Sequence, residues 1–285
     1  MDTPSLVARA KQVGLAALAG FAVAAAGSIT WGALLVTNLR TGPAIPWSVP
    51  AMALVLWLLW RYLGGRWWPH RTSAARRSLL RARPVSGRLF GWSAVAGLLA
   101  LVALAGLWIV LVRLTGYGGN PTLPDASAYG VVTVALAVAM GSLVSPLTEE
   151  AAFRGYSQVL LERKLSPVVA VSLSSAFFAL WHGPTQGFVW SKLLFFFLVG
   201  ASFGTTAYLT SSILPALPVH IAGDLLFFTL IWPHDAARTL VWTHGADAWF
   251  WFHVVQTLVF GALTIVAFRR LARLLPRGPG AAAPT

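Results

Sequence analysis

Long apolar runs separated by short polar stretches dominate this chain of 285 residues. An α-helix needs about 20 predominantly apolar residues to cross a bilayer. Eight stretches approach that length: 13–36, 47–63, 89–112, 128–162, 166–186, 190–210, 211–231 and 249–268. We therefore predict an all-α polytopic membrane bundle of about eight transmembrane helices, forming a single membrane domain over residues 1–285.

The composition agrees with that pattern and removes several alternatives. The chain is 57% hydrophobic and only 10% charged, whereas a soluble domain is about 25% charged. It has no cysteine, which excludes disulfides, a thiolate nucleophile and a cysteine-based zinc site. The segment 22–24 is similar to a signal-peptidase site, but the apolar run around it is too long for a signal peptide. After Pro276 we expect a disordered tail, 276–285.

The basic residues lie at the ends of the apolar runs. The segment 61–88 carries eight arginines: Arg61, Arg66, Arg71, Arg76, Arg77, Arg81, Arg83 and Arg88. Positive charge marks cytoplasmic loops, so we predict that 61–88 is a cytoplasmic loop. With eight spans both termini are then cytoplasmic, and the protein lies in the cell inner or plasma membrane. The net charge of +13 faces anionic lipid, and we expect no nucleic-acid partner.

Three of the eight acidic residues fall inside apolar runs: Glu149, Glu150 and Asp224. An ionisable group at the bilayer centre costs at least ~2.5 kcal/mol, so a functional site is the default explanation. On a helix, Glu150 and Arg154 are four residues apart and share a face, which suits an ion pair. Glu149 points about 100° away and is the candidate general base. The alternative is a purely structural ion pair with Glu149 as a bystander.

Two histidines occupy later apolar runs. His182 ends a Phe-x-x-x-His stretch, and His220 shares a helical face with Asp224 four residues on. Each histidine could instead be satisfied locally, by a carbonyl or by the neighbouring carboxylate. Counted at 1.5 Å per residue from the predicted cytoplasmic helix ends, Glu149 lies ~20 Å deep, His182 ~24 Å and His220 ~14 Å. We therefore expect the three stretches to meet in a site that can activate water and stabilise an oxyanion.

Together these stretches resemble the CAAX protease and bacteriocin-processing family of intramembrane proteases. The family's motifs are Glu-Glu-x-x-x-Arg, Phe-x-x-x-His and His-x-x-x-Asn or Asp, on separate membrane helices. Here the three motifs begin at Glu149, Phe178 and His220, and the resemblance covers about residues 129–231. It implies an intramembrane endopeptidase acting on membrane-associated proteins or on C-terminal or leader peptides.

The resemblance also implies roles for single residues. Glu149 with His182 would activate the attacking water. His220 with Asp224 would stabilise the oxyanion. Glu150 and Arg154 would brace the site.

Asp224 stands where the prenyl-protein endopeptidases of the family have Asn. An ionised carboxylate cannot donate a hydrogen bond to an oxyanion, so Asp224 must either be protonated or orient His220. By type, Glu149, His182, His220 and Asp224 are also acceptable zinc ligands. We favour a metal-free glutamate mechanism with no cofactor, and keep zinc as the alternative.

Other enzyme classes fit less well. Ser202, between Gly200 and Gly204, suggests a rhomboid-type nucleophile, but Phe203 stands where that motif needs Gly. The two glycines have the spacing of small residues that pack membrane helices together. The chain has no His-Glu-x-x-His and no Gly-x-Gly-Asp motif.

A non-catalytic alternative is also open. A transporter or an immunity-type binding protein could use the same buried polar residues to hold a cation or a peptide.

Overall fold

The computed structural model describes residues 6–120 and 126–275, and in those ranges it contains helices and no strands. The predicted disordered tail, 276–285, lies outside the described residues. The all-α polytopic bundle is confirmed. The elements in chain order are α1 (Leu6–Thr41), α2 (Ser48–Leu63), η1 (His70–Thr72), α3 (Ser73–Leu80), α4 (Gly87–Thr115), η2 (Ala126–Ala128), α5 (Val131–Glu149), η3 (Glu150–Ser157), α6 (Gln158–Glu162), α7 (Pro167–Gln186), α8 (Trp190–Thr210), α9 (Leu217–Leu226), η4 (Phe227–Ile231), η5 (Trp232–Ala237), α10 (Val241–His244) and α11 (Ala248–Arg273).

The expected count of eight spans is not confirmed. Within the described residues, six helical stretches are long and apolar enough to cross a membrane, and α5, η3 and α6 together form one of them. The expected second span is α2, whose 16 residues rise only about 24 Å against a hydrocarbon core of about 30 Å. The expected seventh span begins six residues later than predicted, with α9 at Leu217.

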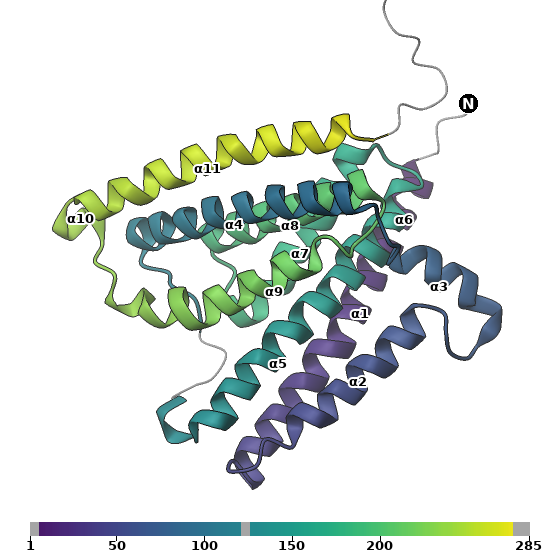
Figure 1. Cartoon of the computed structure of the whole chain (residues 1–285), viewed down its shortest axis with the longest axis horizontal. Coiled ribbons are helices and arrows are strands. Elements are labelled where there is room, and N and C mark those ends of the chain that lie inside the picture. The colour runs from purple at the N-terminus through teal and green to yellow at the C-terminus, as the bar shows by residue number, and fades with distance from the viewer. Residues whose placement is uncertain (1–5, 121–125, 276–285) are drawn as a thin grey trace, which may run out of the picture.

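Figure 1 shows how the helices pack. The last helix, α11, runs along α4, and α7 packs beside α8. The first helix contacts α2, α5 and η3. The start of α1, the segment containing α3, and the end of α11 all lie at one end of the bundle. The fold therefore gathers the basic terminal segments and the predicted cytoplasmic loop at the same end.

Aromatic side chains fill the core next to the helices that carry the polar residues. Trp108 of α4 is 2% exposed and meets Phe195 edge-on at 4.7 Å and Phe227 at 5.9 Å between ring centroids. Its Nε1 donates to Asp235 Oδ2 at 2.8 Å. This hydrogen bond ties α4 to η5 and holds the far ends of the α4 and α9 segments together.

The α3 segment supports η3 from the basic end. A Cβ on Gly155 would stand 3.0 Å from the Leu79 carbonyl oxygen and 3.1 Å from that of Leu80. The next residue, Tyr156, donates its hydroxyl to the Leu63 carbonyl at 2.9 Å. A side chain at Gly155 would push the α3 backbone away by a few tenths of an ångström, so glycine suits this close packing of η3 against α3.

Candidate active site

The helix that carries the two glutamates changes type between them. The predicted continuous helix over 128–162 is present from Val131 to Glu162 and continues through Pro146. Glu149 is the last residue of α5, and Glu150 is the first of the π-helix η3. Short π-helical turns within α-helices occur frequently at functional sites.

The predicted ion pair between Glu150 and Arg154 is present. Arg154 Nη1 lies 3.3 Å from Glu150 Oε1, and both side chains are almost fully buried. The guanidinium carbon also lies 4.0 Å from the centre of the Phe178 ring, a cation–π contact that is strengthened by desolvation. Glu149 is not part of this ion pair, as the helical spacing predicted.

The ring nitrogen of His182 that faces Glu149 is Nε2. Its Nδ1 donates to the Phe178 carbonyl at 2.8 Å, and the ring stacks on Phe196 with centroids 3.8 Å apart. In the neutral ring this leaves Nε2 without a proton. Nε2 lies 3.8 Å from Glu149 Oε1, too far for a direct hydrogen bond.

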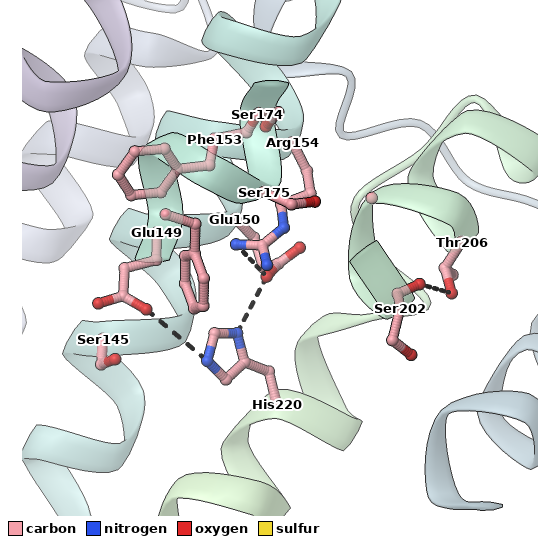
Figure 2. Close-up of polar contacts among 12 residues, drawn as sticks. Ser145, Glu149, Glu150, Phe153, Arg154, Ser174, Ser175, Ser202, Thr206 and His220 are labelled. Carbon is pink, nitrogen blue, oxygen red and sulfur yellow. Dashed lines mark hydrogen bonds and ion pairs between the residues drawn. The ribbon is translucent and has the colours of Figure 1, made fainter. Parts of the chain in front are cut away.

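His220 lies between carboxylates. Its Nδ1 is 3.0 Å from Glu150 Oε1, and its Nε2 is 3.7 Å from Glu149 Oε2 and 3.6 Å from Asp224 Oδ1. Phe203 stacks on the ring at 4.6 Å. Figure 2 shows the imidazole pointing from α9 toward both glutamates, with Arg154 beyond Glu150.

The structure thus brings together all six residues singled out in the sequence. They come from α5, η3, α7 and α9. The sequence paired His220 with Asp224 alone and missed its hydrogen bond to Glu150, which is the shortest contact of that ring to a carboxylate. The roles assigned to the six residues stay predictions.

A cavity of about 630 Å³ opens over this cluster, and Glu149, His182, His220 and Asp224 line it. Much of the remaining wall is aromatic, including Trp31, Trp181, Phe195, Phe196, Phe203 and Phe227. Ser145 also lines the cavity. It lies four residues before Glu149, and that helical spacing would have identified it in the sequence.

In the stretch around Ser202, the two glycines pack against neighbouring helices and the serine lines the cavity. A Cβ on Gly200 would stand 2.9 Å from Ser175, and one on Gly204 would stand 2.9 Å from Gln158 Oε1. Both glycines therefore allow close helix contact, as predicted. Ser202 lines the cavity, but its Oγ makes no hydrogen bond with any described residue. The structure does not pair it with a base, as a serine nucleophile would need.

Among the described residues, no group of three or more His, Asp or Glu side chains is arranged to hold a metal ion. The choice between a metal-free mechanism and zinc stays a prediction.

One comparison with known proteins places these residues in a family domain. Residues 131–226 match the family model described as type II CAAX prenyl endopeptidase Rce1-like. Over these residues, which we call the Rce1-like domain, the chain is similar to that family. The match confirms the resemblance inferred from the three motifs, and the Rce1-like domain contains all six residues of the cluster. Comparison with curated proteins and with solved structures gave no match.

The Rce1-like domain lies within the core of 129–231 expected from the motifs. It spans α5, η3, α6, α7, α8 and α9. Helices α1, α4 and α11 are outside it, although α1 and α4 pack directly on its helices. The domain supports intramembrane endopeptidase activity for this membrane protein.

Proposed function

We propose that the chain hydrolyses peptide bonds of membrane-associated proteins, or of C-terminal or leader peptides, with a water molecule activated by Glu149. The observation that carries this proposal is the facing pair of Glu149 Oε1 and His182 Nε2 at 3.8 Å. Both atoms are hydrogen-bond acceptors, and a water between them would donate one proton to each. The lone pairs of its oxygen would then be free to attack a carbonyl carbon.

The proposed reaction needs only Glu149, one water molecule and the substrate to balance its atoms and protons. As the water oxygen bonds to the carbonyl carbon, Glu149 accepts its proton. Glu149 then returns that proton to the amide nitrogen as the carbon–nitrogen bond breaks. The products are a carboxylic acid and an amine, and no oxidant or covalent enzyme intermediate is needed.

His220 is the proposed donor to the oxyanion. When both ring nitrogens carry protons, Nδ1 donates to Glu150 at 3.0 Å and Nε2 is available to the substrate oxygen. Glu150 is held in turn by Arg154. Because Glu150 already orients the ring, Asp224 is not needed for that purpose and acts beside the substrate instead.

We also propose that the protein is oriented in the membrane as the sequence predicts. Both termini and the arginine-rich segment 61–88 face the cytoplasm of a cell inner or plasma membrane. The grouping of these segments at one end of the bundle supports this orientation (Figure 1), as does the tendency of positive charge to stay cytoplasmic. The partners are lipid and a peptide or membrane-protein substrate, with no nucleic acid.

The test is cleavage of a library of C-terminal and leader-type peptides by detergent-purified protein. Glu149→Gln keeps the shape of the side chain and removes its basicity, so we expect a loss of at least about 10²-fold in kcat/KM. Arg269→Gln, an exposed change at the end of α11, is the matched control and should cleave normally.

Two outcomes would contradict the mechanism. Equal cleavage by the wild type and Glu149→Gln would remove Glu149 from the chemistry. Activity that is lost with a chelator and restored by zinc would make the same residues metal ligands. Peptide binding without cleavage by either protein would favour the non-catalytic alternative.

A further inference from the structure

The turn that ends α2 brings two arginines together. Gly65 has a φ of 64°, and its N–H donates to the Tyr62 carbonyl at 3.0 Å. The N–H of Arg66 donates to the Arg61 carbonyl at 2.8 Å. These two hydrogen bonds form a Schellman motif, in which the residues at the Arg61 and Arg66 positions frequently make an apolar contact. Here both positions carry exposed arginines, so the motif places two like charges next to each other.

Other arginines hold the arginine-rich segment in this shape. Arg76 is 5% exposed, and its guanidinium donates to three backbone carbonyls of the segment at 2.6–2.9 Å. Arg81 pairs with Glu162. By contrast, Arg61 and Arg66 make no ion pair with any described residue, and the segment contains no Asp or Glu. The charges of these two arginines are therefore available to an anion from outside the chain.

An apolar pocket lies directly beside Arg61. It is formed by α2 and α5, has a volume of about 250 Å³, and shares no lining residue with the cavity at the candidate active site. Its lining residues are Leu and Trp apart from Thr148, whose hydroxyl already donates to the Val144 carbonyl at 2.7 Å. Trp57 of this wall is 53% exposed, and the Arg61 guanidinium lies 4.9 Å from the centre of its ring. A fixed cation therefore lies against the wall of a pocket suited to hydrocarbon.

The shortness of α2 favours a position of its end near the lipid headgroups. Its 16 residues rise only about 24 Å, less than the hydrocarbon core of about 30 Å. Arginines at the end of such a helix extend toward the membrane interface. Trp67 and Trp68, just beyond the helix, are 45% and 72% exposed, and tryptophan is enriched at that interface. The arginines would thus meet a headgroup at the level where the pocket could receive the chain of the same lipid.

We propose that the end of α2 binds an anionic phospholipid, with its phosphate on Arg61 and Arg66 and one acyl chain in the pocket between α2 and α5. The inference goes beyond the proposed peptidase function and does not depend on it. Guanidinium groups bind phosphate oxygens in a bidentate manner, and burial of the chain in the apolar pocket is favourable. A zwitterionic lipid adds a cation that the two arginines would repel, so the site selects a net negative headgroup.

The test titrates lipids into the full-length protein in detergent and measures the bound lipid by native mass spectrometry. Phosphatidylglycerol and phosphatidylcholine with the same long acyl chains separate the effect of headgroup charge. Short-chain phosphatidylglycerol and glycerol phosphate separate the effect of the chain. We expect the long-chain phosphatidylglycerol to bind at least about tenfold more tightly than the phosphatidylcholine. The short-chain lipid should bind less tightly, and glycerol phosphate least, because less apolar surface is buried.

The double variant Arg61→Gln with Arg66→Gln should bind long-chain phosphatidylglycerol at least about tenfold more weakly than the wild type. The matched control, Arg269→Gln with Arg273→Gln, removes the same charge from exposed residues at the end of α11. It should stay within about twofold of the wild type, because those charges are not at the site.

Equal weakening in the two double variants would reduce the effect to general positive charge and overturn the site. Equal binding of phosphatidylglycerol and phosphatidylcholine by the wild type would also overturn it, and that comparison needs no variant to fold. Glycerol phosphate that binds as tightly as the long-chain lipid would show that the pocket holds no chain, which contradicts a lipid site.

Discussion

The ion pair under the active site makes a quantitative prediction about Arg154. Its Nη1 lies 3.3 Å from Glu150 Oε1, and the two side chains are 1% and 0% exposed. With an effective dielectric constant of about 20, Coulomb's law gives an attraction of about 5 kcal/mol at that distance. Removing one partner of a buried pair typically costs about 3–5 kcal/mol, because the other charge stays buried without compensation. We therefore expect Arg154→Gln to destabilise the protein by that amount.

The assay is thermal unfolding in detergent. A loss of 1 kcal/mol lowers the Tm by about 2–4 °C in proteins of roughly this size, so Arg154→Gln should lose at least about 6 °C. The double variant, Glu150→Gln with Arg154→Gln, leaves no orphaned charge and should recover at least half of that loss. Arg269→Gln, exposed at the end of α11, should stay within about 0.5 kcal/mol of the wild type. A double variant as unstable as the sum of its two single variants would refute the buried pair.

Two further predictions test the packing around the site and the ion pair between Arg113, in the last turn of α4, and Asp247, which precedes α11. Gly27→Ala places its Cβ against the Thr148 side chain beside the site, whereas Gly32→Ala enters open space; thermal unfolding should show the first to be destabilising and the second neutral or stabilising. The pKa of Asp247 is lowered by its hydrogen bond from Arg113 and then by the backbone N–H of Phe250. A lowered folded pKa means that this stabilisation is present above the unfolded value of about 3.9 and is lost as the pH falls through the folded value. The difference in Tm between wild type and Asp247→Asn should therefore be constant from about pH 5 to 7 and shrink below about pH 4, and an unchanged difference at lower pH would contradict the pairing.

The site could be located in the sequence because a membrane makes buried charge conspicuous. Glu149, His182 and His220 each interrupt an apolar run, and each therefore needed a polar partner. The four-residue spacing then identified the correct glutamate as the partner of Arg154. The same reasoning works poorly in soluble proteins, where polar residues are common everywhere.

The remaining features depend on tertiary contacts that no local pattern reveals. No residue pattern around Glu150 indicates that the helix changes type there. The hydrogen bond from His220 to Glu150 joins residues 70 positions apart. The start of the seventh apolar stretch was also wrong, because hydropathy shows where a segment is apolar but not where its backbone becomes helical.

Two consecutive glutamates contact one histidine at the point where the helix changes type. Neighbouring residues of an α-helix point about 100° apart, so they ordinarily contact different partners. Here Glu149 ends α5, Glu150 begins η3, and the imidazole of His220 lies between their carboxylates with one ring nitrogen toward each (Figure 2). Glu150 is thereby committed to His220 and Arg154, while Glu149 keeps its Oε1 facing His182 across the gap proposed for water. We expect the two carboxylates to differ in role, because Oε1 of Glu150 is held by His220 and Arg154, whereas Glu149 faces the cavity.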